Sequence, residues 1–126
     1  MNEVRVESIV ALTALSEVNT DEQMEVIREE IFGPVVAAMP FKGMQDLVTR
    51  ANNTSYGLAA GVWSSDVTEA HRVAKAIRAG TVWVNCYNVF DAALPFGGYR
   101  QSGWGREMGH AALDNYLETK AVCFKV

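Results

Sequence analysis

The sequence predicts an α/β fold with a parallel-sheet β-α-β-α-β core, followed by a C-terminal helix and a C-terminal strand. Three observations predict it. Short apolar runs alternate with segments of helical periodicity, glycine and proline mark the borders between them, and the last six residues carry valine or phenylalanine at every second position. In such an alternation each strand returns parallel to the previous one through a right-handed crossover.

The first half of the core runs from one apolar segment to the next. Val35–Phe41 is an apolar run between a proline and a glycine, so we expect a buried strand. A helix follows, because apolar residues recur at i, i+3, i+4 and i+7, and Asn52–Thr54 with Gly57 end it. Leu58–Trp63 is the second expected strand. The inward residues of the helix are Met44, Leu47, Val48 and Ala51.

The second half of the core repeats the pattern. Ser65 or Asp66 is expected to cap a second helix, because short side-chain oxygens accept hydrogen bonds from free backbone N–H groups at a helix start. The helix stops at Ala79-Gly80, and the β-branched and aromatic run Thr81–Cys86 is the third strand. The inward residues of this helix are Val67, Ala70, Val73, Ala74 and Ile77.

The secondary structure at the two ends of the chain is predicted from weaker patterns. Residues 87–105 form a loop rich in glycine and aromatic residues, and a third helix is expected over Gly105–Glu118. The alternation in Ala121–Val126 predicts a final strand. Near the N-terminus, Ile9–Leu15 is an apolar run of strand length, and Asn19–Glu22 has the composition of a turn or a helix start.

Composition narrows the class of protein. The chain has 126 residues, which fits one domain, and its net charge of −4 argues against nucleic-acid binding. No apolar run approaches the ~20 residues that a membrane helix needs, and no signal peptide is evident. Cys86 and Cys123 suit reduced thiols rather than a disulfide framework, and His71 and His110 lack metal-ligand spacing. We therefore expect a soluble cytoplasmic protein without a metal, a nucleic acid or a membrane as partner.

The segment Glu29–Pro34 could carry chemistry. A carboxylate can accept two hydrogen bonds from a sugar diol, and a phenyl ring two residues later can pack against a flat heterocycle. The alternative is a solvated acidic helix end with one core phenylalanine. Spacing alone favours that alternative.

A second segment, Pro95–Glu107, holds four glycines in thirteen residues. It contains neither a phosphate-binding loop nor the dinucleotide fingerprint, so a tight turn into the last helix accounts for it. Cys86 closes an apolar strand without a base nearby in the sequence, so burial explains it better than a role as nucleophile.

Taken together, several strings in order resemble the C-terminal portion of the aldehyde dehydrogenase superfamily. The resemblance covers residues 24–126, and one string alone would carry little weight. The strings are EEIFGPV (Glu29–Val35), ANNTSYGL (Ala51–Leu58), AGTVWVNCY (Ala79–Tyr87), PFGGY (Pro95–Tyr99), SGWGRE (Ser102–Glu107) and the closing YLETK (Tyr116–Lys120).

The resemblance implies a cofactor and a substrate. Glu30 falls where the family binds the hydroxyls of the nicotinamide ribose of NAD or NADP, and Phe32 where an aromatic packs near the nicotinamide. Phe90 and Phe96 match aromatics that line the aldehyde tunnel. The loop Asn88–Leu94 looks closest to members that act on arylacetaldehydes such as phenylacetaldehyde.

The resemblance also implies roles near the C-terminus. Glu107 matches an acid implicated in proton release, and Arg106 and Glu118 match a pair implicated in subunit contacts. Twelve residues of continuous helix would separate that pair by roughly 18 Å. We therefore expect their contact to cross between subunits of a homo-oligomer.

The family's catalytic cysteine motif, general-base glutamate, dinucleotide-binding half and cofactor-binding lysine find no counterpart here. We divide the chain into a divergent N-terminal segment (1–23), a partial catalytic domain (24–118) and an oligomerisation strand (119–126). The favoured hypothesis is the C-terminal part of an NAD(P)-dependent aldehyde dehydrogenase that is inactive alone. The alternative is a non-catalytic interaction module that pairs through its final strand. A third hypothesis, a small nucleotide-binding protein, is disfavoured because no glycine fingerprint follows a strand.

Overall fold

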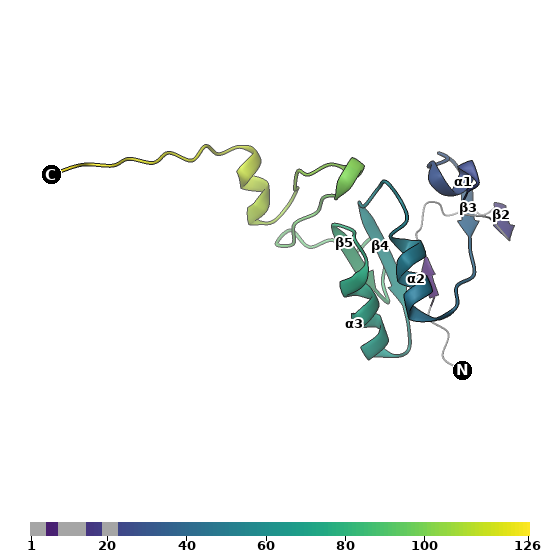
Figure 1. The fold of residues 1–126 in the computed structure, drawn as a ribbon. Coiled ribbons are helices and arrows are strands. Elements are labelled where there is room, and N and C mark those ends of the chain that lie inside the picture. Colours follow the sequence, from purple (N-terminus) through teal and green to yellow (C-terminus); the bar gives the residue numbers. More distant parts are fainter. Residues whose placement is uncertain (1–4, 8–14, 19–22) are drawn as a thin grey trace.

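The structure, a computed structural model, describes residues 5–7, 15–18 and 23–126 (Figure 1). The turn or helix start expected at Asn19–Glu22 lies outside the described residues, as does most of the strand expected at Ile9–Leu15. The elements, in chain order, are β1 (Arg5–Glu7), β2 (Leu15–Val18), α1 (Glu25–Arg28), β3 (Val35–Ala38), α2 (Gly43–Ala51), β4 (Ala59–Trp63), α3 (Val67–Ala76), β5 (Thr81–Val84) and the 3₁₀ helices η1 (Arg100–Ser102) and η2 (His110–Asn115).

The strands form two sheets. β4 lies between β5, which is parallel to it, and β1, which is antiparallel to it. β2 and β3 form a separate parallel pair. The predicted α/β class with a parallel sheet is confirmed. The three predicted core strands do not share one sheet, however, because β3 pairs with β2 and not with β4.

The core lies between the β4–β5 pair and the two longer helices, which Figure 1 shows on one side of these strands. Val62 of β4 and Val73 of α3 are fully buried. Around them gather Leu47 of α2, with Ala70 and Ile77 of the α3 segment. Val67, which was predicted to face inward, is 65% exposed at the first position of α3.

The predicted cap of α3 is Asp66. Its Oδ1 accepts hydrogen bonds from the backbone N–H groups of Thr68 at 2.8 Å and Glu69 at 3.1 Å. These two N–H groups have no partner inside the helix, so the carboxylate satisfies their hydrogen bonds. Its negative charge also interacts favourably with the positive end of the helix dipole.

The predicted helix over Gly105–Glu118 is wrong. The structure has only the 3₁₀ helix η2 there, because Met108 and Gly109 take φ angles of 62° and 57°, in the left-handed region where a right-handed helix cannot pass. The backbone N–H of Gly109 donates instead to the carbonyl of Ala92 at 2.9 Å.

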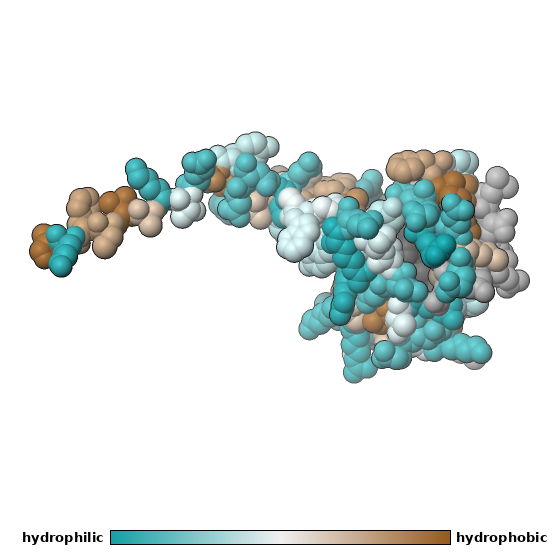
Figure 2. All heavy atoms as spheres, turned by 45° about the horizontal axis from the view of Figure 1, so that its top comes forward, coloured by the Kyte–Doolittle hydropathy of each residue, from teal (hydrophilic) through white to brown (hydrophobic). Residues whose placement is uncertain are grey.

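The predicted strand Ala121–Val126 is also wrong for this chain. Residues 117–126 adopt no helix or strand and project away from the rest of the molecule (Figure 1). A strand needs a partner for its backbone groups, and this segment finds none within the described residues. Val122, Phe124 and Val126 are exposed, and Figure 2 shows hydrophobic residues along this projecting end.

Candidate functional site

A row of aromatic side chains connects strand β5 to the loop after it. Its members are Trp83, Tyr87, Phe90 and Phe96. The ring centroid of Trp83 lies 5.1 Å from that of Tyr87 and 5.6 Å from that of Phe90. Phe90 in turn lies 5.2 Å from Phe96, with the planes at 79°. These are edge-to-face contacts, which are the favoured geometry for aromatic pairs. The structure thus brings together the two residues predicted to line an aldehyde tunnel.

The loop that carries Phe90 is fixed to strand β5 by a hydrogen bond. The indole N–H of Trp83, a buried residue of β5, donates to the carbonyl of Val89 at 2.7 Å. Phe96 is held from the other side by a backbone bridge to Glu107, in which each N–H donates to the other residue's carbonyl at 2.7 Å. Glu107, predicted for proton release, therefore lies next to the aromatic pair, with its side chain exposed to solvent.

The side chain of Arg106 forms its hydrogen bonds within its own loop. One of its guanidinium nitrogens, Nη1, donates to the carbonyls of Gly98, Trp104 and Gly105 at 2.8, 3.2 and 2.9 Å. The guanidinium also lies 5.5 Å from the ring centroid of Tyr99, a cation–π contact. This arginine closes the loop that presents Phe96.

Glu118, its predicted partner in subunit contacts, lies beyond η2 in the exposed C-terminal segment. The separation of roughly 18 Å assumed an unbroken helix, and the structure has no such helix. The distance between Arg106 and Glu118 therefore does not follow from helix geometry, and the role of the pair in subunit contacts stays a prediction.

The two predicted cofactor contacts follow α1. Glu30 is exposed and lines a pocket of about 580 Å³. Phe32 is 88% exposed and is not part of the pocket wall. The volume falls in the range of small-molecule sites, about 300–1,000 Å³. Of the two residues, Glu30 belongs to the pocket wall, and the cofactor roles of Glu30 and Phe32 stay predictions.

The pocket and the row of aromatic side chains meet at Tyr87. This residue lines the pocket and contacts Trp83, which in turn contacts Phe90. The remaining wall comes from α1 and the segment after it, from β3 and Met39, from the C-terminal end of α2 and the loop that leads to β4, from the start of β4, from residues 77–79 after α3, and from Ser102. Sequence reasoning did not single out Tyr87, although it closes the AGTVWVNCY string.

A second contact that the sequence analysis missed holds the glycine-rich loop on the body. Nη1 of Arg100 donates to the carbonyl of Asn52 at 2.9 Å and, through a short contact, to that of Thr54. The N–H of Gly57 donates to Oγ of Ser102 at 3.0 Å, and its carbonyl accepts from the N–H of Tyr99 at 2.9 Å. The loop with Phe96 is thereby fixed to the turn after α2.

The same turn is braced by Asn52. Its Nδ2 donates to the carbonyl of Ala76 at 2.9 Å, and its Oδ1 accepts from the N–H of Arg78 at 2.7 Å. The amide therefore ties the C-terminal end of α2 to that of α3. An asparagine after a helix is a signal for a cap, but its distant partners leave no trace in the local sequence.

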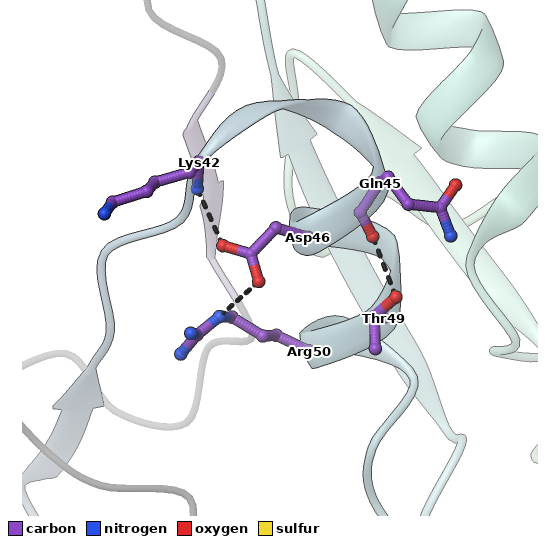
Figure 3. Close-up of polar contacts among 5 residues, drawn as sticks. All are labelled: Lys42, Gln45, Asp46, Thr49 and Arg50. Atoms are coloured by element: carbon purple, nitrogen blue, oxygen red, sulfur yellow. Dashed lines mark hydrogen bonds and ion pairs between the residues drawn. The ribbon is translucent and has the colours of Figure 1, made fainter.

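One carboxylate near the pocket has a shifted pKa. Oδ1 of Asp46 accepts from Nε of Arg50 at 2.8 Å, and its Oδ2 accepts from the backbone N–H of Lys42 at 2.7 Å (Figure 3). The hydrogen bond from Arg50, followed by that from Lys42, lowers the pKa of Asp46. Asp46 thereby orients Arg50, which lines the pocket.

Two further features bear on chemistry. Within the part of the chain that the structure describes, no group of three or more His, Cys, Asp or Glu residues could hold a metal ion. Cys86 is half-buried and Cys123 is exposed, and both are free thiols. None of the helices in the described ranges is long and apolar enough to cross a membrane.

The sequence profile of the aldehyde dehydrogenase family matches residues 6–122, so the chain belongs to this family. It is 59% identical over 104 residues to the putative aldehyde dehydrogenase DhaS of Bacillus subtilis, covering 82% of this chain and 21% of that protein. The profile match begins inside the segment 1–23, and the division of the chain into three parts stays a prediction.

Solved structures agree with this assignment. The NAD+ complex of an aldehyde dehydrogenase from Bacillus cereus superposes with a TM-score of 0.78 at 54% identity, over 85% of this chain and 21% of that one. The P. syringae indole-3-acetaldehyde dehydrogenase gives a TM-score of 0.80 at 44% identity, over 88% and 22%. The chain thus spans about a fifth of the length of the relatives it matches.

Proposed function

We propose that this chain is the C-terminal part of an NAD(P)-dependent aldehyde dehydrogenase, which oxidises an aldehyde to a carboxylic acid. The contact of Phe90 with Phe96, 5.2 Å between centroids and next to Glu107, carries the proposal. Membership in the family supports the reaction class.

Each residue has a defined task in this proposal. The carboxylate of Glu30 accepts hydrogen bonds from two ribose hydroxyls, which orients the cofactor at the pocket. The ring pair Phe90–Phe96 forms an apolar wall that binds the aldehyde and excludes water. The carboxylate of Glu107 takes up a proton released from the site. NAD(P), when bound, supplies the hydride acceptor.

Neither of the chain's own thiols is part of the pocket wall. Cys123 belongs to the projecting C-terminal end, and Cys86 lies two residues after β5. We therefore propose that the nucleophilic thiolate comes from a part of the fold outside these 126 residues, and that the isolated chain is inactive. Free thiols also fit a location in the reducing cytoplasm.

We further propose arylacetaldehydes as the substrate class. An edge-to-face ring pair offers a third aromatic ring both a face and an edge to contact. The similarity to indole-3-acetaldehyde dehydrogenase supports this choice. An aliphatic aldehyde of equal length would lose the ring contacts, which contribute about 0.5–1.5 kcal/mol each.

The test is a chimera in which this chain replaces the matching fifth of the DhaS relative. We expect NAD-dependent oxidation of phenylacetaldehyde by the chimera and none by the 126-residue chain. Glu30→Gln should raise the KM for NAD, and Phe90→Ala the KM for phenylacetaldehyde, while His71→Ala on the exposed face of α3 serves as control. NADH formation by the isolated chain would contradict the proposed division of labour.

A second candidate function is an interaction module that acts through residues 119–126. The exposure of Val122, Phe124 and Val126 in a segment without a strand partner favours it. We expect concentration-dependent association in sedimentation experiments, and Phe124→Asp should weaken it more than Lys125→Asp. A monomer at all concentrations would exclude self-association through this segment.

A further inference from the structure

Strands β4 and β5 carry different residues on their two faces, because successive side chains of a strand point to opposite sides of the sheet. Val62 faces the helices, since it packs in the core with Val73 of α3. Gly61 and Trp63 therefore face the other way. Trp83 joins them there, because it is the register partner of Gly61 on β5. The face away from the helices thus carries two indole rings.

Gly61 makes room for one of these rings. A Cβ atom on Gly61 would lie 2.4 Å from Cζ3 and 2.6 Å from Cη2 of Trp63. The indole of Trp63 therefore lies over the backbone of Gly61, which pairs with Trp83 on the neighbouring strand. A larger residue at position 61 would displace this ring.

Tyr87 contacts both indole rings, because the chain turns directly after β5. The turn begins at Asn85, whose φ of 53° lies in the left-handed region and ends the extended backbone. The ring centroid of Tyr87 lies 5.1 Å from that of Trp83, in an edge-to-face contact. It lies 6.5 Å from the centroid of Trp63, with the planes tilted by 36°.

The side chain of Asn85 anchors this turn to the end of β4. Its Oδ1 accepts from the backbone N–H of Ser64 at 2.9 Å, and its Nδ2 donates to the carbonyl of Ser64 at 3.0 Å. The side-chain amide thus takes the place of a further strand residue opposite Ser64 and satisfies both of its backbone groups. Tyr87 follows two residues after this fixed point.

Trp83 connects Tyr87 to the residues proposed to bind the aldehyde. Its ring contacts Phe90 edge-to-face at 5.6 Å, and its indole N–H donates to the carbonyl of Val89 at 2.7 Å. A rotation of this indole would break both contacts and release Phe90 from its place against Phe96. Tyr87, packed against the same indole, restricts such a rotation.

We propose that Tyr87 is a positioning residue for the aldehyde-binding ring pair Phe90–Phe96, and that it acts through the indole of Trp83. The contacts that carry this role are made by the ring of Tyr87, so phenylalanine at position 87 retains them. The inference rests on the proposed function, because it adds a residue to the same site.

The first measurement uses the 126-residue chain and follows hydrogen exchange of the Trp83 indole N–H by NMR. Trp83→Phe identifies its signal among those of the three tryptophans. We expect Tyr87→Leu to speed this exchange by about fivefold, because an aromatic contact shifts an equilibrium several-fold. Tyr87→Phe should leave the exchange unchanged. Tyr116→Leu, at a tyrosine that is 84% exposed, is the matched control. Slow amide exchange at 59–63 and 81–84 checks that the sheet persists.

The second measurement uses the chimera with the DhaS relative. We expect Tyr87→Leu to raise the KM for phenylacetaldehyde by about fivefold with kcat unchanged, and Tyr87→Phe to restore the original KM. The KM for hexanal should change less, because an aliphatic chain makes no ring contacts with Phe90 and Phe96. A merely structural role of Tyr87 would instead lower kcat for both aldehydes alike.

The outcomes separate this inference from the proposed function. Unchanged protection of the Trp83 indole in Tyr87→Leu would overturn the inference, and so would equal losses in Tyr87→Leu and Tyr87→Phe. An equal rise in KM for phenylacetaldehyde and hexanal would also overturn it. A chimera without activity would count against the proposed function, and the exchange measurement on the 126-residue chain would then decide the role of Tyr87.

Discussion

Arg100 is the residue whose replacement tests most directly how the glycine-rich loop is held. Its Nη1 donates to the carbonyls of Asn52 and Thr54, and its φ of 53° lies in the left-handed region. Two effects therefore oppose each other at one position. The hydrogen bonds stabilise the docked loop, while a side chain at positive φ destabilises it.

The magnitudes follow from these two effects. A hydrogen bond from a charged donor contributes about 1.5–3 kcal/mol. Because Arg100 is half-buried, we take the lower end and expect Arg100→Ala to lower the free energy of unfolding by about 2 kcal/mol. Arg100→Gly loses the same bonds but relieves about 1 kcal/mol of backbone strain. The expected stability order is wild type, then glycine, then alanine.

Urea unfolding followed by tryptophan fluorescence measures these differences. Arg72→Ala, at an exposed arginine on α3, is the control and should change stability by less than about 0.5 kcal/mol. An alanine variant as stable as the wild type would refute the role of the two hydrogen bonds. An alanine variant more stable than the glycine variant would refute the assignment of strain.

Three further predictions concern packing and pH. Val73→Ala, at a fully buried position of α3, should cost about 2 kcal/mol, whereas Val67→Ala on the same helix should be near neutral in the same urea assay. Gly80→Ala places a methyl group against the carbonyl of Gly97 and should destabilise the chain by about 3 kcal/mol, with faster amide exchange in the 95–107 loop. Asp46 has a pKa lowered from 3.8, so its stabilising contribution is fully present above that value and is lost as the pH falls through the lower pKa of the folded state. Asp46→Asn should therefore be less stable than the wild type at neutral pH, with the difference closing in acid. A pH-independent difference would contradict the assigned contacts.

Elements whose determinants are local could be predicted from the sequence. Helix α3 is one, because Asp66 and the spacing of Ala70, Val73 and Ile77 lie within a dozen residues. The region after Gly105 is the opposite case. Its helical pattern gives way to hydrogen bonds from distant residues, above all that between Gly109 and Ala92. Local propensity loses to such tertiary contacts.

Strand pairing shows the same limit. The apolar run at β3 predicts a strand, but the run itself does not encode whether β2 or β4 will be its neighbour. The candidate site likewise contains residues that could be predicted and residues that could not. Resemblance to the family pointed to Phe90 and Phe96, which the structure brings into contact. Arg100 went unnoticed because a cation in a glycine-rich loop has no sequence pattern that reveals distant carbonyl partners.

The projecting C-terminal end has a consequence for the life of the protein in the cell. Unpaired, exposed chain ends are the sites at which proteases first cut. Residues 117–126 offer such an end, with Phe124 and Val122 accessible along it. A surface that covers this end would therefore protect the polypeptide from cleavage there.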